Sequence, residues 1–119
     1  MATQCEDDFD NTGFETQYLL RNTTELNLFY LSPSGSLIDF EAQSILNIAN
    51  DLNPDTEPIP PSQTFIFDEI RLFNQINGDF ILVYEQSPLN DDLWSFKEPS
   101  MNRFEYELII TDDLIEPTN

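Results

Sequence analysis

An Asn-Gly pair constrains the fold of this chain more than any other local feature. Asn77 and Gly78 separate two apolar segments, residues 70–73 and residues 80–84. Asparagine and glycine tolerate the positive backbone angles of a two-residue hairpin turn, so the two segments are predicted to pair as antiparallel neighbours. Residues 80–84 are apolar at every position, which predicts a central strand that is covered on both faces.

Other segments have the composition and alternation of short strands. Residues 18–21, 25–31, 36–40 and 44–49 are rich in β-branched or aromatic side chains and are separated by turn residues. Residues 103–111 alternate between apolar and polar side chains; the apolar positions in register are Phe104, Tyr106, Leu108 and Ile110. Before the hairpin the parity of the apolar positions changes, which predicts a bulge or a break at Asp68 and Glu69.

Length and composition limit the chain to one domain. It has 119 residues, of which 39% are hydrophobic and 13% aromatic, enough for one core and too few for two. We therefore expect an all-β fold: a single antiparallel two-sheet sandwich, Ig-like or related, with about seven strands, formed by residues 15–119. Residues 1–14 are acidic and lack alternation, so they are expected to form a flexible tether.

Two long connections interrupt the strands. Residues 50–63 contain four prolines, which remove donors of the strand ladder, so this segment is predicted to cross the surface between the sheets. Residues 86–102 contain Trp94 and Phe96, and this segment is predicted to be a long loop. Two alternatives follow for Trp94 and Phe96: the rings bind a partner protein, or they plug one end of the sandwich.

The residue inventory argues against catalysis and against nucleic acid. Four basic residues against 23 acidic ones give a formal charge of -19, which repels phosphate backbones and anionic lipid headgroups. The chain has no histidine and one cysteine, so serine-histidine triads, cysteine-histidine pairs and common zinc sites cannot be built from it. No pair of acids stands out as a catalytic pair, so we expect a non-enzymatic protein without a cofactor.

A weak calcium pattern lies in the proline-rich segment. Asp51, Asn53 and Asp55 repeat the first three oxygen ligands of a calcium loop. Thr56 replaces the expected glycine and Ser62 stands where the bidentate acid belongs, so an EF-hand is rejected and only an adventitious site is left as a candidate. The triplet Asn22-Thr23-Thr24 has glycosylation spacing and is interpreted as a turn at a strand edge.

The lone cysteine indicates a lipid anchor. Cys5 has no cysteine to pair with and no histidine to activate it, and it precedes the acidic run Glu6, Asp7, Asp8, Phe9 and Asp10. This run resembles the export signal of surface lipoproteins of the Bacteroidota, flavobacteria in particular, in which an acylated cysteine is followed by a polar residue, two acids, an aromatic and an acid. Residues 1–4 are then interpreted as standing in place of a removed signal peptide.

The body of the chain is also similar to small flavobacterial lipoproteins. The similarity rests on Asn-Thr-Thr before a Leu-x-Leu-x-Tyr strand, a turn at Gly35, the Asn-Gly hairpin and the ending Tyr-Glu-Leu-Ile-Ile-Thr-Asp-Asp over residues 106–113. The resemblance implies a small β-sandwich on the cell surface and carries no established activity.

Two functions are carried forward from the sequence. The first is a surface-exposed outer-membrane lipoprotein, anchored through an N-terminal lipid, that is an accessory subunit or binding module of a larger outer-membrane protein. The alternative is a cytosolic acidic inhibitor, a DNA mimic or toxin-immunity protein, whose negative face blocks a basic site. This alternative applies if Met1 is the native start, because a four-residue leader cannot direct export.

Overall fold

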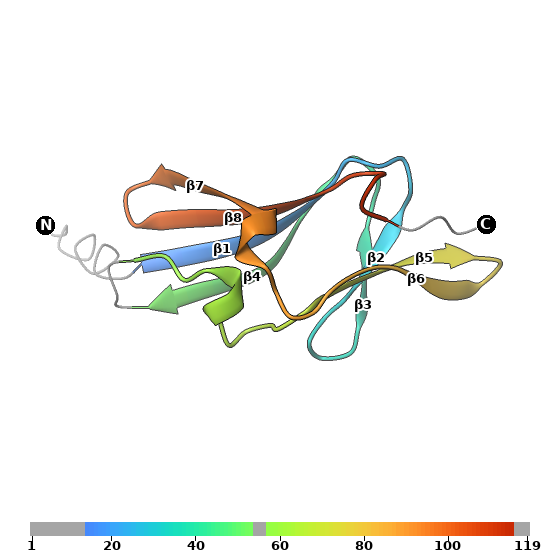
Figure 1. Cartoon of the computed structure of the whole chain (residues 1–119), viewed down its shortest axis with the longest axis horizontal. Coiled ribbons are helices and arrows are strands. Elements are labelled where there is room, and N and C mark those ends of the chain that lie inside the picture. The colour runs from blue at the N-terminus through green and yellow to red at the C-terminus, as the bar shows by residue number, and fades with distance from the viewer. Residues whose placement is uncertain (1–13, 54–56, 116–119) are drawn as a thin grey trace, which may run out of the picture.

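Residues 14–53 and 57–115 of the computed structural model form a β-sandwich with two short 3-10 helices, Pro61–Gln63 and Asp91–Leu93. The all-β class is confirmed, with eight strands in place of about seven (Figure 1). The strands are β1 (Phe14–Asn22), β2 (Leu28–Leu31), β3 (Leu37–Phe40), β4 (Ile45–Asn53), β5 (Ile70–Ile76), β6 (Asp79–Gln86), β7 (Trp94–Ser100) and β8 (Arg103–Ile110).

The strands form two four-stranded sheets. The first has the order β4-β1-β8-β7 and the second the order β3-β2-β5-β6. Every neighbouring pair is antiparallel except β1 and β8, which run parallel, so the expectation of a wholly antiparallel sandwich is wrong for this pair. The sheets are offset along the long axis of the molecule, and the β5–β6 hairpin extends beyond the first sheet (Figure 1).

A single core lies where the two sheets overlap. Alternate residues of β1 and β8 from the first sheet meet alternate residues of β2 and β5 from the second. The least exposed apolar side chains of this core are Tyr18, Leu20, Leu28, Tyr30, Phe40, Ile70, Leu72, Val83, Leu108 and Ile110. Burial of these side chains supplies the main favourable free energy of folding.

The hairpin at Asn77 and Gly78 is confirmed. Asn77 has a φ of 54° and Gly78 a φ of 88°, and Ile76 pairs with Asp79 across the turn. The central position predicted for residues 80–84 is wrong, because β6 is an edge strand that pairs only with β5 among the described strands. A strand that is apolar on both faces has the same sequence pattern whether its second face is buried in its own domain or exposed to solvent.

The connections between the sheets follow the proline pattern in part. The chain passes from the first sheet to the second between β4 and β5, as predicted for the segment with four prolines, although residues 50–53 still belong to β4. The strand β5 starts only at Ile70, so the predicted break at Asp68 and Glu69 is confirmed. The break turns Phe67 into the core, but Phe65 is fully exposed.

The segment predicted as a long loop over residues 86–102 contains a strand. The 3-10 helix Asp91–Leu93 leads directly into β7, which pairs with β8 from Trp94 to Ser100. Lys97, Glu98 and Pro99 obscured this strand in the sequence. They are tolerated because β7 is an edge strand, which proline and charged residues commonly occupy.

Asn22 connects two of the crossings between the sheets. Its side chain is fully buried at the end of β1. Its Nδ2 atom donates to the carbonyl oxygens of Leu26 (2.9 Å), Phe40 (3.1 Å) and Glu41 (3.1 Å), and its Oδ1 atom accepts from the backbone N–H and the hydroxyl of Thr24 (2.9 and 2.7 Å). The predicted turn therefore starts at a buried residue, which leaves no room for a glycan.

We expect Asn22→Ala to lower the free energy of unfolding by about 3 kcal/mol, because it leaves several buried backbone groups without hydrogen-bond partners. Urea denaturation followed by circular dichroism measures the change. Asn47→Ala is the matched control, because the Asn47 amide makes an exposed hydrogen bond to Asn50, and its effect should stay below about 0.5 kcal/mol. Equal losses in the two variants would contradict the role of Asn22.

Candidate docking surface

Apolar side chains cover the solvent-facing side of the second sheet. In β2 and β5 the buried residues alternate with residues that point away from the core. Residues directly opposite each other on antiparallel strands share a face, so the register extends this outer side to β3 and β6. We call the resulting surface the outer apolar face; its apolar members are Phe29, Leu31, Leu37, Phe73, Phe80 and Leu82.

The outer apolar face is in contact with solvent. Leu37, Phe80 and Leu82 are 39%, 42% and 43% exposed, and the other three are half-buried beside them. The rings of Phe29 and Phe80 meet edge to face, with centroids 5.0 Å apart, although β5 lies between their strands. Clustered apolar side chains on the open face of a sheet are typical of a surface that a partner covers.

The solvent-facing side of the first sheet differs sharply in chemistry. Three of the four basic residues of the chain lie on β1, β7 and β8, opposite or beside acids. Arg21 Nε lies 3.0 Å from Glu107 Oε2, and Arg103 Nε lies 3.4 Å from Glu15 Oε1. This side therefore carries ion pairs, together with the exposed side chains of Ile45, Leu52 and Ile109.

Acidic residues border the outer apolar face. Asp39 lies on β3 opposite Phe29, and no salt bridge within the described residues engages its carboxylate. Asp79, at the turn end of β6, is opposite Ile76 and therefore belongs to the other side of the sheet. Arg71 is the basic residue of this sheet, and it pairs with Glu85 at 3.1 Å and with Glu69 at 3.4 Å. The border is thus net negative, and it complements a partner that has basic residues around an apolar patch.

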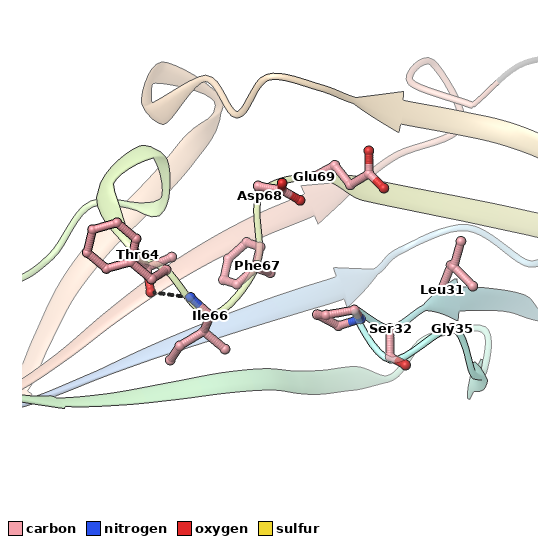
Figure 2. A pocket seen from close by; sticks show the side chains of 10 residues that line it. Leu31, Ser32, Gly35, Thr64, Ile66, Phe67, Asp68 and Glu69 are labelled. Carbon is pink, nitrogen blue, oxygen red and sulfur yellow. Dashed lines mark hydrogen bonds between the residues drawn. The ribbon is translucent and has the colours of Figure 1, made fainter.

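A groove adjoins one end of the outer apolar face. It holds about 540 Å³ between the β2–β3 turn and residues 64–69, and Leu31 contributes to both surfaces (Figure 2). Its hydroxyl groups are already engaged: Thr64 Oγ1 bonds to Asp51 and to the backbone N–H of Ile66, and Ser32 Oγ bonds to Ser34 and Ser36. The groove offers apolar surface and two carboxylates, Asp68 and Glu69, without the convergent polar groups of a catalytic site.

Trp94 does not lie on a surface loop. It starts β7, is 7% exposed, and packs against Phe67 with ring centroids 6.1 Å apart. Its Nε1–H donates to Gln86 Oε1 at 2.9 Å. The prediction that Trp94 anchors a partner is corrected, because its own domain already covers the ring; the alternative of a core plug is right for Trp94.

Phe96 differs from Trp94 in exposure. It is 47% exposed and lies against Tyr106, with ring centroids 5.1 Å apart. Its role as a partner contact stays a prediction. It belongs to the first sheet, so it is not continuous with the outer apolar face.

The calcium candidates fall on a strand rather than a loop. Asp51 and Asn53 belong to β4, and the Asp51 carboxylate accepts from Thr64, while Asp55 lies outside the described residues. Within residues 14–53 and 57–115, no group of three His, Cys, Asp or Glu side chains could hold a metal ion. No helix in the same ranges is long and apolar enough to cross a membrane.

The anchor residues are not part of the described structure. Cys5 and the run Glu6, Asp7, Asp8, Phe9 and Asp10 all precede Phe14, where β1 begins. Comparisons with protein families, with curated proteins and with solved structures found no match to this chain. Its function therefore has to be argued from its own residues.

Sequence reasoning missed the outer apolar face, although a signal was present. Residues 28–31 are apolar at every position, and residues 70–73 at all positions except Arg71. In a half-buried sheet one parity of each strand is normally polar. Three neighbouring strands that are apolar on both parities, in a chain without a helical segment to cover them, could have indicated an exposed face.

Buried tyrosines lie beneath these surfaces. Burial raises the pKa of Tyr30 to about 12, and Glu69 adds to the shift. Burial also raises the pKa of Tyr18 and of Tyr106. The Tyr18 hydroxyl donates to the carbonyl of Ile59 at 2.7 Å, whereas the Tyr30 hydroxyl has no hydrogen-bond partner within the described residues.

These shifts predict an alkaline loss of stability. A pKa above the ordinary value of 10.0 means that the folded state holds the Tyr30 proton more tightly than the unfolded state. The stabilisation is complete below pH 10 and is lost as the pH rises through the folded pKa of about 12. Unfolding in urea at increasing pH, with tyrosinate absorbance recorded in parallel, measures the effect.

Tyr30→Phe and Tyr18→Phe form a matched pair for this prediction. Tyr30→Phe removes a buried hydroxyl without a partner, so its stability at pH 7 should be unchanged or higher, and part of the alkaline loss should disappear. Tyr18→Phe removes a made hydrogen bond and should cost about 1 kcal/mol at pH 7. A larger cost for Tyr30→Phe than for Tyr18→Phe would contradict the assignment.

Proposed function

We propose that this chain is a surface-exposed outer-membrane lipoprotein, held by a lipid on Cys5, that acts as a non-enzymatic accessory subunit or binding module of a larger outer-membrane protein. The outer apolar face is the contact surface for that partner. The single observation that supports a binding role is the set of six apolar side chains on the solvent-facing side of the second sheet.

The chemistry of the described residues favours binding over catalysis. The polar groups in the groove are satisfied by neighbours, and the apolar face carries no acid–base pair. The resemblance of residues 5–10 to a lipoprotein export signal supplies the location. Partner binding at a membrane also fits the negative border, because the same charges repel anionic lipid headgroups and leave the face for a protein.

The inhibitor alternative has less support from the structure. A mimic of DNA needs carboxylates spaced along a face without interleaved cations. On the outward side of the first sheet, Arg21 and Arg103 neutralise Glu107 and Glu15, and Lys97 lies opposite Glu105 in the register. The outward side of the second sheet is mostly apolar, and on it Arg71 pairs with Glu85. Neither face has the charge pattern of a phosphate backbone.

Cys5→Ser should release the protein from membranes, because it removes the acceptor of the lipid. The protein is expressed in a flavobacterial host behind a lipoprotein signal peptide, and membrane and soluble fractions are compared by immunoblot. Met101→Ser, at a side chain that is 82% exposed, is the control and should stay in the membrane fraction. A Cys5→Ser variant that still sediments with membranes would refute the anchor.

A pair of acidic substitutions tests the contact surface. Leu37→Glu with Leu82→Glu places charges on the outer apolar face, and Ile45→Glu with Ile109→Glu places them at similarly exposed positions on the first sheet. Burying an unpaired carboxylate at an interface costs several kcal/mol, so the first pair should abolish co-purification of the native outer-membrane partner after cross-linking in the host. The second pair should not.

Equal recovery of cross-linked partner with both pairs would show that the outer apolar face is not the contact. Circular dichroism of each purified variant establishes that the fold is retained. All four substituted side chains are already exposed to solvent, so neither pair of substitutions should alter the core.

A further inference from the structure

We propose that the open edge of β6 binds an extended segment of the partner protein, which pairs with β6 as an added strand and places its own apolar side chains on the outer apolar face. This inference rests on the proposed function and specifies how the partner is held. In this contact, backbone hydrogen bonds join the partner segment to the edge of β6, and apolar side chains of the segment pack on the outer apolar face beside it.

The hairpin geometry determines which backbone groups of β6 are free. Across a two-residue turn the flanking residues, Ile76 and Asp79, exchange hydrogen bonds, and the pairing then alternates as far as Leu82, after which the register shifts. The N–H and C=O groups of Phe80 and Leu82 therefore point away from β5, toward the open edge. The side chains of the same two residues belong to the outer apolar face, so the free backbone and the apolar surface coincide.

The other edge strands are protected against such pairing. β3 has only four residues, β7 carries Lys97 and Pro99, and β4 carries several asparagines and Asp51. Natural proteins block exposed edges with short strands, charges and prolines. β6 has no charge and no proline over residues 80–84, where every side chain is apolar or aromatic, and its register against β5 shifts only after Leu82. Among the four described edges, this one alone is left as a template.

The side chains around β6 define the chemistry of the segment that fits. Asp79 and Glu85 lie at the two ends of the strand, and Phe80 and Leu82 lie between them. A complementary segment carries apolar, preferably β-branched, residues at alternate positions and lysine or arginine near its ends. Because Arg71 already pairs with Glu85, Asp79 is the stronger site for a partner cation.

A second copy of this chain fits the same edge poorly. In an antiparallel pair of β6 strands centred on Leu82, Asp79 of each copy would lie opposite Glu85 of the other. Like charges directly opposite each other destabilise a pair of strands, and each chain carries a formal charge of -19. A basic partner meets no such repulsion.

A synthetic peptide tests the inference. The probe is as long as β6, with valine or isoleucine alternating with threonine and a lysine at each end, and its binding is followed by fluorescence anisotropy. Leu82→Pro and Leu82→Ala both shorten the side chain, but only Leu82→Pro removes the outward N–H. Edge strands tolerate proline where the N–H faces solvent.

We expect the probe to bind the wild-type protein and to bind Leu82→Pro about tenfold more weakly than Leu82→Ala, the loss of roughly one hydrogen bond. Replacement of both probe lysines by glutamate should weaken binding further. Thermal unfolding shows whether Leu82→Pro is folded; if it is not, Phe80→Pro and Phe80→Ala replace the pair. Ile109→Ala on the first sheet should bind the probe as the wild type does.

Four outcomes would overturn the inference. The probe fails to bind, or it binds the proline and alanine variants equally. Sedimentation shows a dimer that Leu82→Pro dissociates, which would make a second copy the occupant. Vesicles of zwitterionic lipid bind the protein and displace the probe, which would make lipid the occupant. Loss of the cross-linked partner with Leu37→Glu and Leu82→Glu would still support the proposed function in each case.

Discussion

The carboxamide of Asn22 is the interaction on which the relative position of the two sheets depends. It lies at the end of β1 and binds backbone groups of the β1–β2 crossing and of the β3–β4 crossing together. Thr23 adds two hydrogen bonds to Ile110 at the end of β8, and Gln43 donates to Thr23 and Thr24. Apolar burial drives the sheets together without direction, whereas these directional bonds decide how they are oriented.

In this arrangement each sheet has one side in the core and one side facing solvent. The solvent-facing sides of the two sheets differ in chemistry. The first sheet presents ion pairs that interact well with water, and the second presents phenylalanine and leucine. In the described residues the sheets are accompanied only by two short 3-10 helices, so no layer of helices covers either outer side. The exposed apolar side chains are the surface that we propose a partner covers.

Short sequence patterns predicted individual turns and strands well, but they predicted poorly which strands lie next to each other in the sheets. Asn77 and Gly78 predicted the hairpin because the turn geometry is determined by those two residues, and the alternation over β8 predicted a half-buried strand. The edge position of β6, the strand that contains Trp94 and the parallel pairing of β1 with β8 depend on contacts between distant segments, which leave no signature in a short window. The candidate site was missed although its strands are apolar on both parities, because its six side chains come from four strands and only the sheet order brings them together.

The parallel pairing of β1 and β8 determines when the domain can fold. The first strand is held between β4 and the last strand, so the first sheet cannot be completed until nearly the whole chain has been synthesised. Contacts between the two ends of a chain carry the greatest loop-closure entropy and form slowly. A protein that is exported through a narrow channel must stay unfolded until it has passed. In this topology, late completion is a property of the strand order itself, and it suits the export that we propose for this chain.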